Sequence, residues 1–217
     1  MRRAVTAEFL GAVLLTAAVV GSGIMAERLA GGNLGLALLA NTGATVAALA
    51  TLIALFGPIS GAHFNPVVTL VALWRDEMRP EQSIAFIAAQ IAGCCAGAVL
   101  ANAMFELPLI QASTHVRTGF AQWLSESVAT AGLIVVAFSS PTITAAAWRV
   151  SAWIGAAYWF TASTSFANPA ITLGRSLSDS FAGIRPADAP GFIAAQLVGA
   201  VIGAILLRLL TEQKAAA

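Results

Sequence analysis

Two asparagines and two glutamates stand out in this sequence because their surroundings are apolar. Asn65 and Asn168 each precede a proline between long apolar stretches, and Glu8 and Glu126 lie inside such stretches. Asparagine is a preferred N-cap residue and proline is favoured at the first helical position, so each Asn-Pro pair predicts a helix start. An asparagine that caps its helix through the side-chain oxygen keeps its amide N–H groups as donors. Two such donors facing one cavity would orient a neutral, hydroxylated molecule.

The composition places these residues in a membrane protein. Of the 217 residues, 59% are hydrophobic and 10% are charged, with a net charge of +1, whereas about a quarter of a soluble domain is charged. The mean hydropathy is +0.84. This composition excludes a soluble enzyme, a nucleic-acid-binding protein and a disordered chain. A helix needs about 20 apolar residues to cross a bilayer, and the stretches that qualify are residues 5–25, 34–56, 82–104, 123–140, 143–163 and 191–210.

The chain repeats three landmarks in the same order. The segment SGAHFNPVVTL (60–70) matches STSFANPAITL (163–173), FIAAQ (86–90) recurs as FIAAQ (192–196), and Glu8 has a counterpart in Glu126. Each half holds three spans, and an odd number means that the second half enters the bilayer from the opposite side. We therefore expect an all-α membrane protein with a single channel domain over residues 1–217. Its inverted repeats would cover approximately 5–104 and 123–210, joined by an outer loop, 105–122.

The two Asn-Pro segments are too short to cross a bilayer and too apolar to lie in water. A re-entrant half-helix that lines a cavity fits both properties. By inversion, two half-helices would enter from opposite faces and meet at the midplane, where their positive ends oppose cations. The extended residues before each asparagine can present backbone carbonyls to the cavity, and these are Gly61, Ala62, His63, Thr164, Ser165 and Phe166.

The distribution of basic residues predicts the orientation, because cytoplasmic loops are enriched in Lys and Arg. With the N-terminus inside, the basic residues at the cytoplasmic face are Arg2, Arg3, Arg75, Arg79, Arg149, Arg208 and Lys214. The residues outside are Arg28, Arg117, Arg175 and Arg185. We therefore expect a multi-pass protein of the cell (inner) membrane with both termini in the cytoplasm.

These motifs resemble those of the aquaporin and glycerol-facilitator family over essentially the whole chain. The resemblance rests on AEFLG in the first span, AAQ in the third and sixth, and the paired motifs Asn65-Pro66-Val67 and Asn168-Pro169-Ala170. Val67 is a mild departure from the usual alanine. The resemblance implies six tilted spans, two half-helices, one pore per subunit, a homotetramer and no cofactor, with Asn65 and Asn168 at the pore midplane.

The resemblance also implies a selectivity filter of four positions, one of which is usually an arginine three residues after the second asparagine. Here that residue is Ile171, and an ungapped count places the others at Thr45, Ala156 and Ser165. These side chains predict a wide, weakly polar pore for neutral solutes larger than water, although a water-selective aquaporin remains an alternative. The sequence is similar to bacterial aquaporins linked to arsenic resistance, which implies passage of arsenous acid and methylated arsenicals as well as glycerol-like polyols.

Three polar residues keep two interpretations each. Arg175 lies two helical turns after Asn168 and either forms a displaced basic ring at the outer vestibule or pairs with Asp179. Glu8 and Glu126 either couple transport to protons, as in a carrier, or accept hydrogen bonds from a re-entrant loop, which the resemblance implies.

A non-conducting structural protein is a further alternative. An enzyme is not expected, because no nucleophile–base pair or metal-ligand cluster is present.

Overall fold

The computed structural model describes residues 1–212, with side chains described up to residue 210. Lys214, which the charge distribution places in the cytoplasm, lies outside the described residues. The elements are α1 (Arg2–Leu29), α2 (Leu34–Ser60), α3 (Pro66–Trp74), α4 (Pro80–Met104), α5 (Phe120–Phe138), α6 (Ile143–Phe160), α7 (Pro169–Arg175), η1 (Pro186–Asp188) and α8 (Ala189–Glu212). Within the described residues the fold is all-α, as the sequence predicts.

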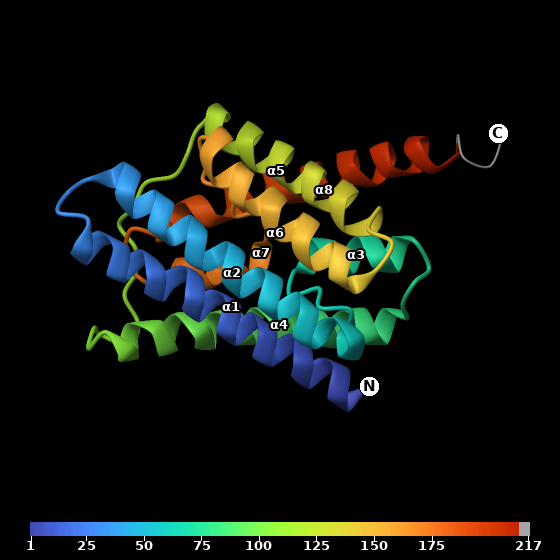
Figure 1. The fold of residues 1–217 in the computed structure, drawn as a ribbon, viewed down its shortest axis with the longest axis horizontal. Coiled ribbons are helices and arrows are strands. Elements are labelled where there is room, and N and C mark those ends of the chain that lie inside the picture. Colours follow the sequence, from blue (N-terminus) through green and yellow to red (C-terminus); the bar gives the residue numbers. More distant parts are fainter. Residues whose placement is uncertain (213–217) are drawn as a thin grey trace.

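Most of the long helices can cross a membrane by length and composition. These are α1, α2, α4, α5 and the stretch Pro186–Leu210 that contains α8, with mean hydropathies from 1.3 to 2.2. Helix α6 is 18 residues long and is not among them, because Arg149 and three tryptophans lower its hydropathy. It nevertheless packs against α2 and α5 along the bundle, in the position of the expected fifth span (Figure 1).

The observed helices extend beyond several of the predicted spans. Helix α1 begins at Arg2 and ends at Leu29, whereas the sequence predicted 5–25. An apolar stretch marks only the part of a helix inside hydrocarbon, and helical turns continue into the polar interface. Helix α6 is instead shorter than its predicted span, because it ends at Phe160 and not at residue 163. The residue after its last turn, Thr161, has an extended backbone.

The helices form two sets with matching contacts. Helix α1 packs against α2 and α4, α5 packs in the same way against α6 and α8, and α2 and α6 join the two sets. The half-helices α3 and α7 touch each other, and each packs on the last helix of the opposite set, α3 on α8 and α7 on α4. Helix α1 begins and α8 ends toward the same end of the bundle (Figure 1). The predicted class, with two half-helices in an inverted repeat, is confirmed.

Glycines allow the first and last helices of each set to approach closely. A Cβ atom on Gly93 of α4 would lie 2.6 Å from the Phe9 carbonyl oxygen of α1. A Cβ atom on Gly203 of α8 would lie 2.6 Å from the Ala131 carbonyl oxygen of α5. Small residues are the usual means of close helix packing in a membrane. The α1–α4 and α5–α8 interfaces therefore both rely on a glycine at the point of closest approach.

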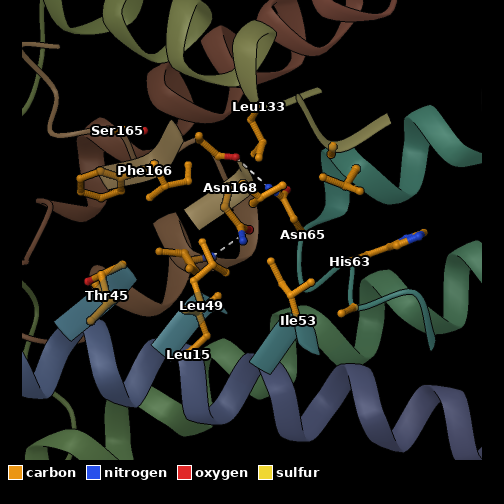
Figure 2. Close-up of a pocket in the computed structure, with 18 of the residues that line it drawn as sticks. Leu15, Thr45, Leu49, Ile53, His63, Asn65, Leu133, Ser165, Phe166 and Asn168 are labelled. Carbon is orange, nitrogen blue, oxygen red and sulfur yellow. Dashed lines mark hydrogen bonds between the residues drawn. The ribbon is translucent and has the colours of Figure 1, made fainter. Parts of the chain in front are cut away.

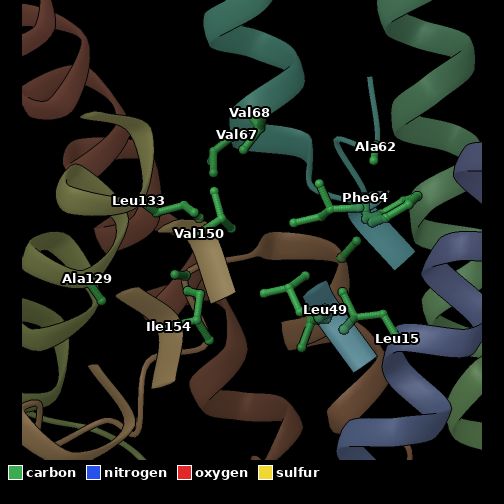
Figure 3. Packing of buried hydrophobic residues seen from close by; sticks show 14 of the residues in the cluster. Leu15, Leu49, Ala62, Phe64, Val67, Val68, Ala129, Leu133, Val150 and Ile154 are labelled. Carbon is green, nitrogen blue, oxygen red and sulfur yellow. The ribbon is translucent and has the colours of Figure 1, made fainter. Parts of the chain in front are cut away.

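Buried apolar side chains from α1, α2, α5 and α6 surround the starts of the half-helices. Figure 3 shows Leu15, Leu49, Leu133 and Ile154 in this cluster together with Phe64, which directly precedes the first asparagine. All five side chains are less than 10% exposed. This packing holds the two short helices in place, since neither is long enough to be stable alone.

Candidate functional site

A cavity of about 180 Å³ lies where the two half-helices meet. Figure 2 shows Asn65 and Asn168 near its middle, with Thr45, Ser165 and Phe166 on one side and His63 on the other. The remaining wall is mainly apolar and includes Leu15, Val19, Leu49, Ile53, Val68, Leu133, Val150 and Ile154. The cavity therefore offers a few polar groups inside an apolar tube.

Each asparagine caps its own half-helix and also reaches the other half of the chain. The Asn65 side-chain oxygen accepts from the Val67 N–H at 3.1 Å, and the Asn168 oxygen accepts from the Ala170 N–H at 3.0 Å. The Asn65 amide donates to the Ala167 carbonyl and the Asn168 amide donates to the Phe64 carbonyl, both at 2.8 Å (Figure 2). Each side-chain amide thus donates one N–H to a backbone carbonyl of the other repeat, and its second N–H can donate to a molecule in the cavity.

The segments before the asparagines are not extended, so that expectation was wrong. Ala62 and Phe64 have φ angles of 51° and 48°, and Ser165 and Ala167 at the matching positions both have 48°. Residues other than glycine rarely adopt this left-handed conformation, and such strain persists only where surrounding contacts enforce it. The contacts that enforce it here come from the two buried glutamates.

Glu8 holds the first of these segments. Its Oε1 accepts from the Ser60 hydroxyl at 2.6 Å and the His63 N–H at 3.0 Å. Its Oε2 accepts from the Phe64 N–H at 2.7 Å and the Gln90 amide at 2.8 Å. The side chain is fully buried. Consecutive backbone N–H groups turn toward one carboxylate, which forces the irregular backbone of this loop.

Glu126 holds the second segment in the same way. Its Oε1 accepts from the Ser163 hydroxyl at 2.6 Å and the Phe166 N–H at 2.9 Å. Its Oε2 accepts from the Ala167 N–H at 2.8 Å and the Gln196 amide at 2.7 Å. A buried carboxylate is costly unless its oxygens are hydrogen-bonded, and four donors satisfy this one.

Two glutamines complete the support, and their role was not identified from the sequence. The Gln90 amide also donates to the Thr69 hydroxyl at 2.9 Å, and the Gln196 amide donates to the Thr172 hydroxyl at 3.0 Å. Each glutamine therefore ties a glutamate to the half-helix that follows its loop. The signal was present, because these are the last residues of the repeated FIAAQ segment.

Three of the four expected filter residues line the cavity, and one does not. Thr45, Ser165 and Ile171 are buried and contribute to the wall. Ala156 is exposed on the outside of α6, so its assignment was wrong. Tyr158, two residues further on, lines the cavity and its hydroxyl lies 3.3 Å from that of Thr45. The ungapped count failed because it cannot show which face of a helix turns inward.

Arg175 lies in the wall of the cavity and not among solvent-exposed charges. It is 2% exposed, its guanidinium lies 3.3 Å from the centre of the Phe166 ring, and its Nε donates to the Ala182 carbonyl. The suggested pairing with Asp179 is not what the structure shows. That carboxylate instead accepts from the N–H and hydroxyl of Thr114.

Arg117 belongs to the same region, although the sequence identified it only as an outer basic residue. Its guanidinium donates to the carbonyls of Gly183 at 2.8 Å, Ser163 at 3.2 Å and Phe181 at 3.3 Å. It also lies 5.1 Å from the centre of the Phe166 ring. Burial lowers the pKa of this guanidinium. Arg117 thus ties the loop before α5 to the second re-entrant segment.

Five of the six residues expected to present carbonyls line the cavity, and the sixth does not. Thr164 is not among the lining residues, and its hydroxyl lies 3.5 Å from an Arg117 nitrogen. Those that do line the wall are Gly61, Ala62, His63, Ser165 and Phe166.

A bundle of membrane-crossing helices with a cavity between two opposed half-helices defines a multi-pass membrane protein with a pore-like centre. The sequence matches the family model described as "Major intrinsic protein" over residues 1–144 and 139–217. The chain therefore belongs to the major intrinsic protein family. Aquaglyceroporins of this family are channels and not enzymes.

Individual relatives agree with this assignment. The chain is 50% identical over 214 residues to a protein named aquaglyceroporin AqpS from Rhizobium meliloti (strain 1021), covering 98% of this chain and 91% of that one. It is 36% identical over 96 residues to the lens fiber major intrinsic protein of Gallus gallus, covering 44% and 35% of the two chains. The X-ray structure of the aquaglyceroporin from Plasmodium falciparum shares the fold, with a TM-score of 0.70, 19% identity, and coverage of 94% and 93%.

Proposed function

We propose that this protein is a passive channel for small neutral solutes, namely glycerol-like polyols, metalloid hydroxides such as arsenous acid, and water. The observation that carries the proposal is the pair Asn65 and Asn168, which meet in a cavity whose wall is otherwise mainly apolar. A neutral hydroxylated molecule can accept from the remaining amide N–H groups, and a cation is opposed by two positive helix ends. The relative with the name aquaglyceroporin supports the same solute class.

The two buried glutamates favour a channel over a proton-coupled carrier. Every carboxylate oxygen of Glu8 and Glu126 accepts two hydrogen bonds, and the donors include backbone N–H groups that have no other acceptor in the loop. Protonation would remove acceptors that the loop needs. These carboxylates therefore support the loops and do not exchange protons with the pore.

The filter that we propose contains Thr45, Tyr158, Ser165 and Ile171, with Arg175 one helical turn beyond Ile171 at the outer vestibule. Ile171 cannot donate a hydrogen bond, so the constriction lacks the arginine that competes for water in related channels. Tyr158 narrows the bore relative to the alanine expected from the sequence, and its hydroxyl adds a polar contact. The result is a passage with one apolar and one polar side, suited to glycerol and to polyhydroxylated metalloids.

We further propose that the subunits form a homotetramer in the cell (inner) membrane, each with its own pore and with both termini in the cytoplasm. The whole of residues 1–217 acts as one channel domain, with repeats 5–104 and 123–210. The carbonyls of residues 61–63 and 165–166 serve as acceptors along the path of the solute.

Uptake of arsenous acid into vesicles tests this function. Vesicles that contain the protein should take up arsenous acid faster than empty vesicles, at a rate that a protonophore does not change. The Asn168→Leu variant should be slow, because it replaces a midplane donor with an apolar side chain, and Arg28→Gln on the surface is the matched control. Uptake that stops when the proton gradient is removed would exclude a passive channel.

A further inference from the structure

Two buried arginines without a carboxylate partner lie at one end of the cavity. Arg117 and Arg175 are 8% and 2% exposed and both contact the Phe166 ring. In the part of the chain whose side chains are described, the ion pairs are Arg75 with Glu77 and Arg185 with Asp188. The Asp188 carboxylate also accepts from the Arg117 backbone N–H at 2.9 Å, but not from its guanidinium. Glu126 attracts both guanidiniums from a distance but forms no ion pair with either, since its oxygens accept from donors of the re-entrant loop. The two guanidiniums therefore lack a direct counterion, which is costly in a low-dielectric interior.

The two arginines differ in how well they are satisfied. Arg117 donates from three guanidinium nitrogens to backbone carbonyls. Arg175 has a single hydrogen-bond acceptor among the described residues, the Ala182 carbonyl, although a guanidinium has five N–H donors. Since Arg175 also lines the cavity, its remaining N–H groups are available to a molecule inside it.

A second polar group in the same wall is also without a partner. The Ser165 hydroxyl is buried and makes no hydrogen bond. Ser165 directly precedes Phe166, whose ring Arg175 contacts, and both residues lie at the same end of the cavity (Figure 2). A buried hydroxyl without a partner destabilises the protein because the hydrogen bonds it made to water are not replaced. An arginine can only donate and a serine can donate, so a ligand that satisfies both must supply acceptor oxygens. An oxyanion also supplies the missing negative charge.

We propose that this end of the cavity is a binding site for a small oxyanion, held by Arg175 and Ser165. Beyond this site the described wall is mainly apolar, with Leu49, Ile53, Leu133 and Val150, which disfavours a charged molecule and keeps the anion at this end of the cavity. A bound oxyanion therefore occupies the solute path and slows the flux of neutral solutes. Only this blocking effect rests on the proposed channel function, since binding itself depends on the geometry alone.

Titration calorimetry of the purified protein with inorganic phosphate, in chloride-free buffer, tests the binding. The wild type should bind phosphate, and Arg175→Gln should weaken binding by about tenfold or more, because a charge-assisted pair is lost. Ser165→Ala removes a hydroxyl that has no partner in the protein, so it should fold normally and bind phosphate several-fold more weakly. Arg28→Gln is the matched control, because Arg28 also contacts a phenylalanine ring and a backbone carbonyl but lies outside the cavity.

Glycerol flux into vesicles gives an independent measurement. Phosphate on both sides of the membrane should slow glycerol entry through the wild type and Arg28→Gln, and should have a much smaller effect on Arg175→Gln. Equal binding by the wild type, Arg175→Gln and Ser165→Ala, or no binding by any of them, would overturn the proposal. Glycerol flux with no phosphate binding would overturn only this proposal, whereas phosphate binding without glycerol flux would overturn only the channel function.

Discussion

Replacing Glu126 by glutamine separates loop support from proton coupling. The side chain is fully buried and accepts four hydrogen bonds. In the variant, the amide oxygen can keep the Ala167 N–H and the Gln196 amide. The new NH₂ group then faces two groups that donated to Oε1 in the wild type. The Ser163 hydroxyl can rotate and accept a hydrogen bond from the NH₂ group. The Phe166 N–H cannot, and it is left without an acceptor.

The expected loss of stability follows from this count. Two hydrogen bonds to a charged group, each contributing about 1.5–3 kcal/mol, are lost, and one neutral bond of about 1 kcal/mol is regained. The variant should therefore be less stable by about 2–5 kcal/mol, and its unfolding temperature should fall by about 4–20 °C for a chain of this size. Glu8→Gln should behave in the same way, because its four partners occupy matching positions.

Thermal unfolding in detergent, followed by tryptophan fluorescence, measures the effect. Glu81→Gln is the control, because Glu81 lies exposed in the first turn of α4 and a surface change of this kind is within about 0.5 kcal/mol. The reasoning would be refuted if Glu126→Gln unfolded at the wild-type temperature, and if wild-type flux depended on a proton gradient while flux through the variant did not. That result would assign the carboxylate to proton coupling.

Three further substitutions test the pore and the helix packing. Ile171→Arg should slow glycerol flux by about tenfold, because a bulky cation fills an apolar position, and it should leave water flux unchanged. Unchanged glycerol flux in a folded variant would show that Ile171 does not form the constriction. Tyr158→Ala should widen the pore and admit erythritol in a vesicle swelling assay, whereas Ala156→Tyr, on the outer face of α6, should not alter erythritol entry. Gly203→Val should reduce the folded yield in size-exclusion chromatography, because the Cβ of the valine would lie 2.6 Å from the Ala131 carbonyl oxygen. A normal yield would show that α5 and α8 can move apart at little cost in stability.

The elements that could be predicted from the sequence are those set by local rules. The half-helices begin at Asn65 and Asn168 because the capping preference of asparagine and the fixed φ of proline act within a few residues. The inverted arrangement was predictable because FIAAQ recurs unchanged, the Asn-Pro pairs recur at matching positions, and each half holds an odd number of spans. The spans were located by hydropathy, although their ends were not, since helices continue into the interface.

The features that could not be predicted depend on which face of a helix turns inward. Ala156 and Tyr158 are two residues apart and lie on different faces of α6, and only contacts with α2 and α5 decide between them. Arg117 lies outside every repeated motif and reaches the site through the fold of the loop before α5. The alternating backbone at Ala62 and Phe64 likewise depends on a carboxylate more than 50 residues earlier.

Stopped-flow light scattering after a glycerol osmotic jump tests the central claim most directly. Vesicles that contain the protein should shrink quickly as water leaves and then reswell quickly as glycerol enters, with both rates independent of a proton gradient. Fast shrinkage without reswelling would show a water-selective pore and would contradict the wide passage inferred from Ile171. Rates equal to those of empty vesicles would contradict the assignment of a channel.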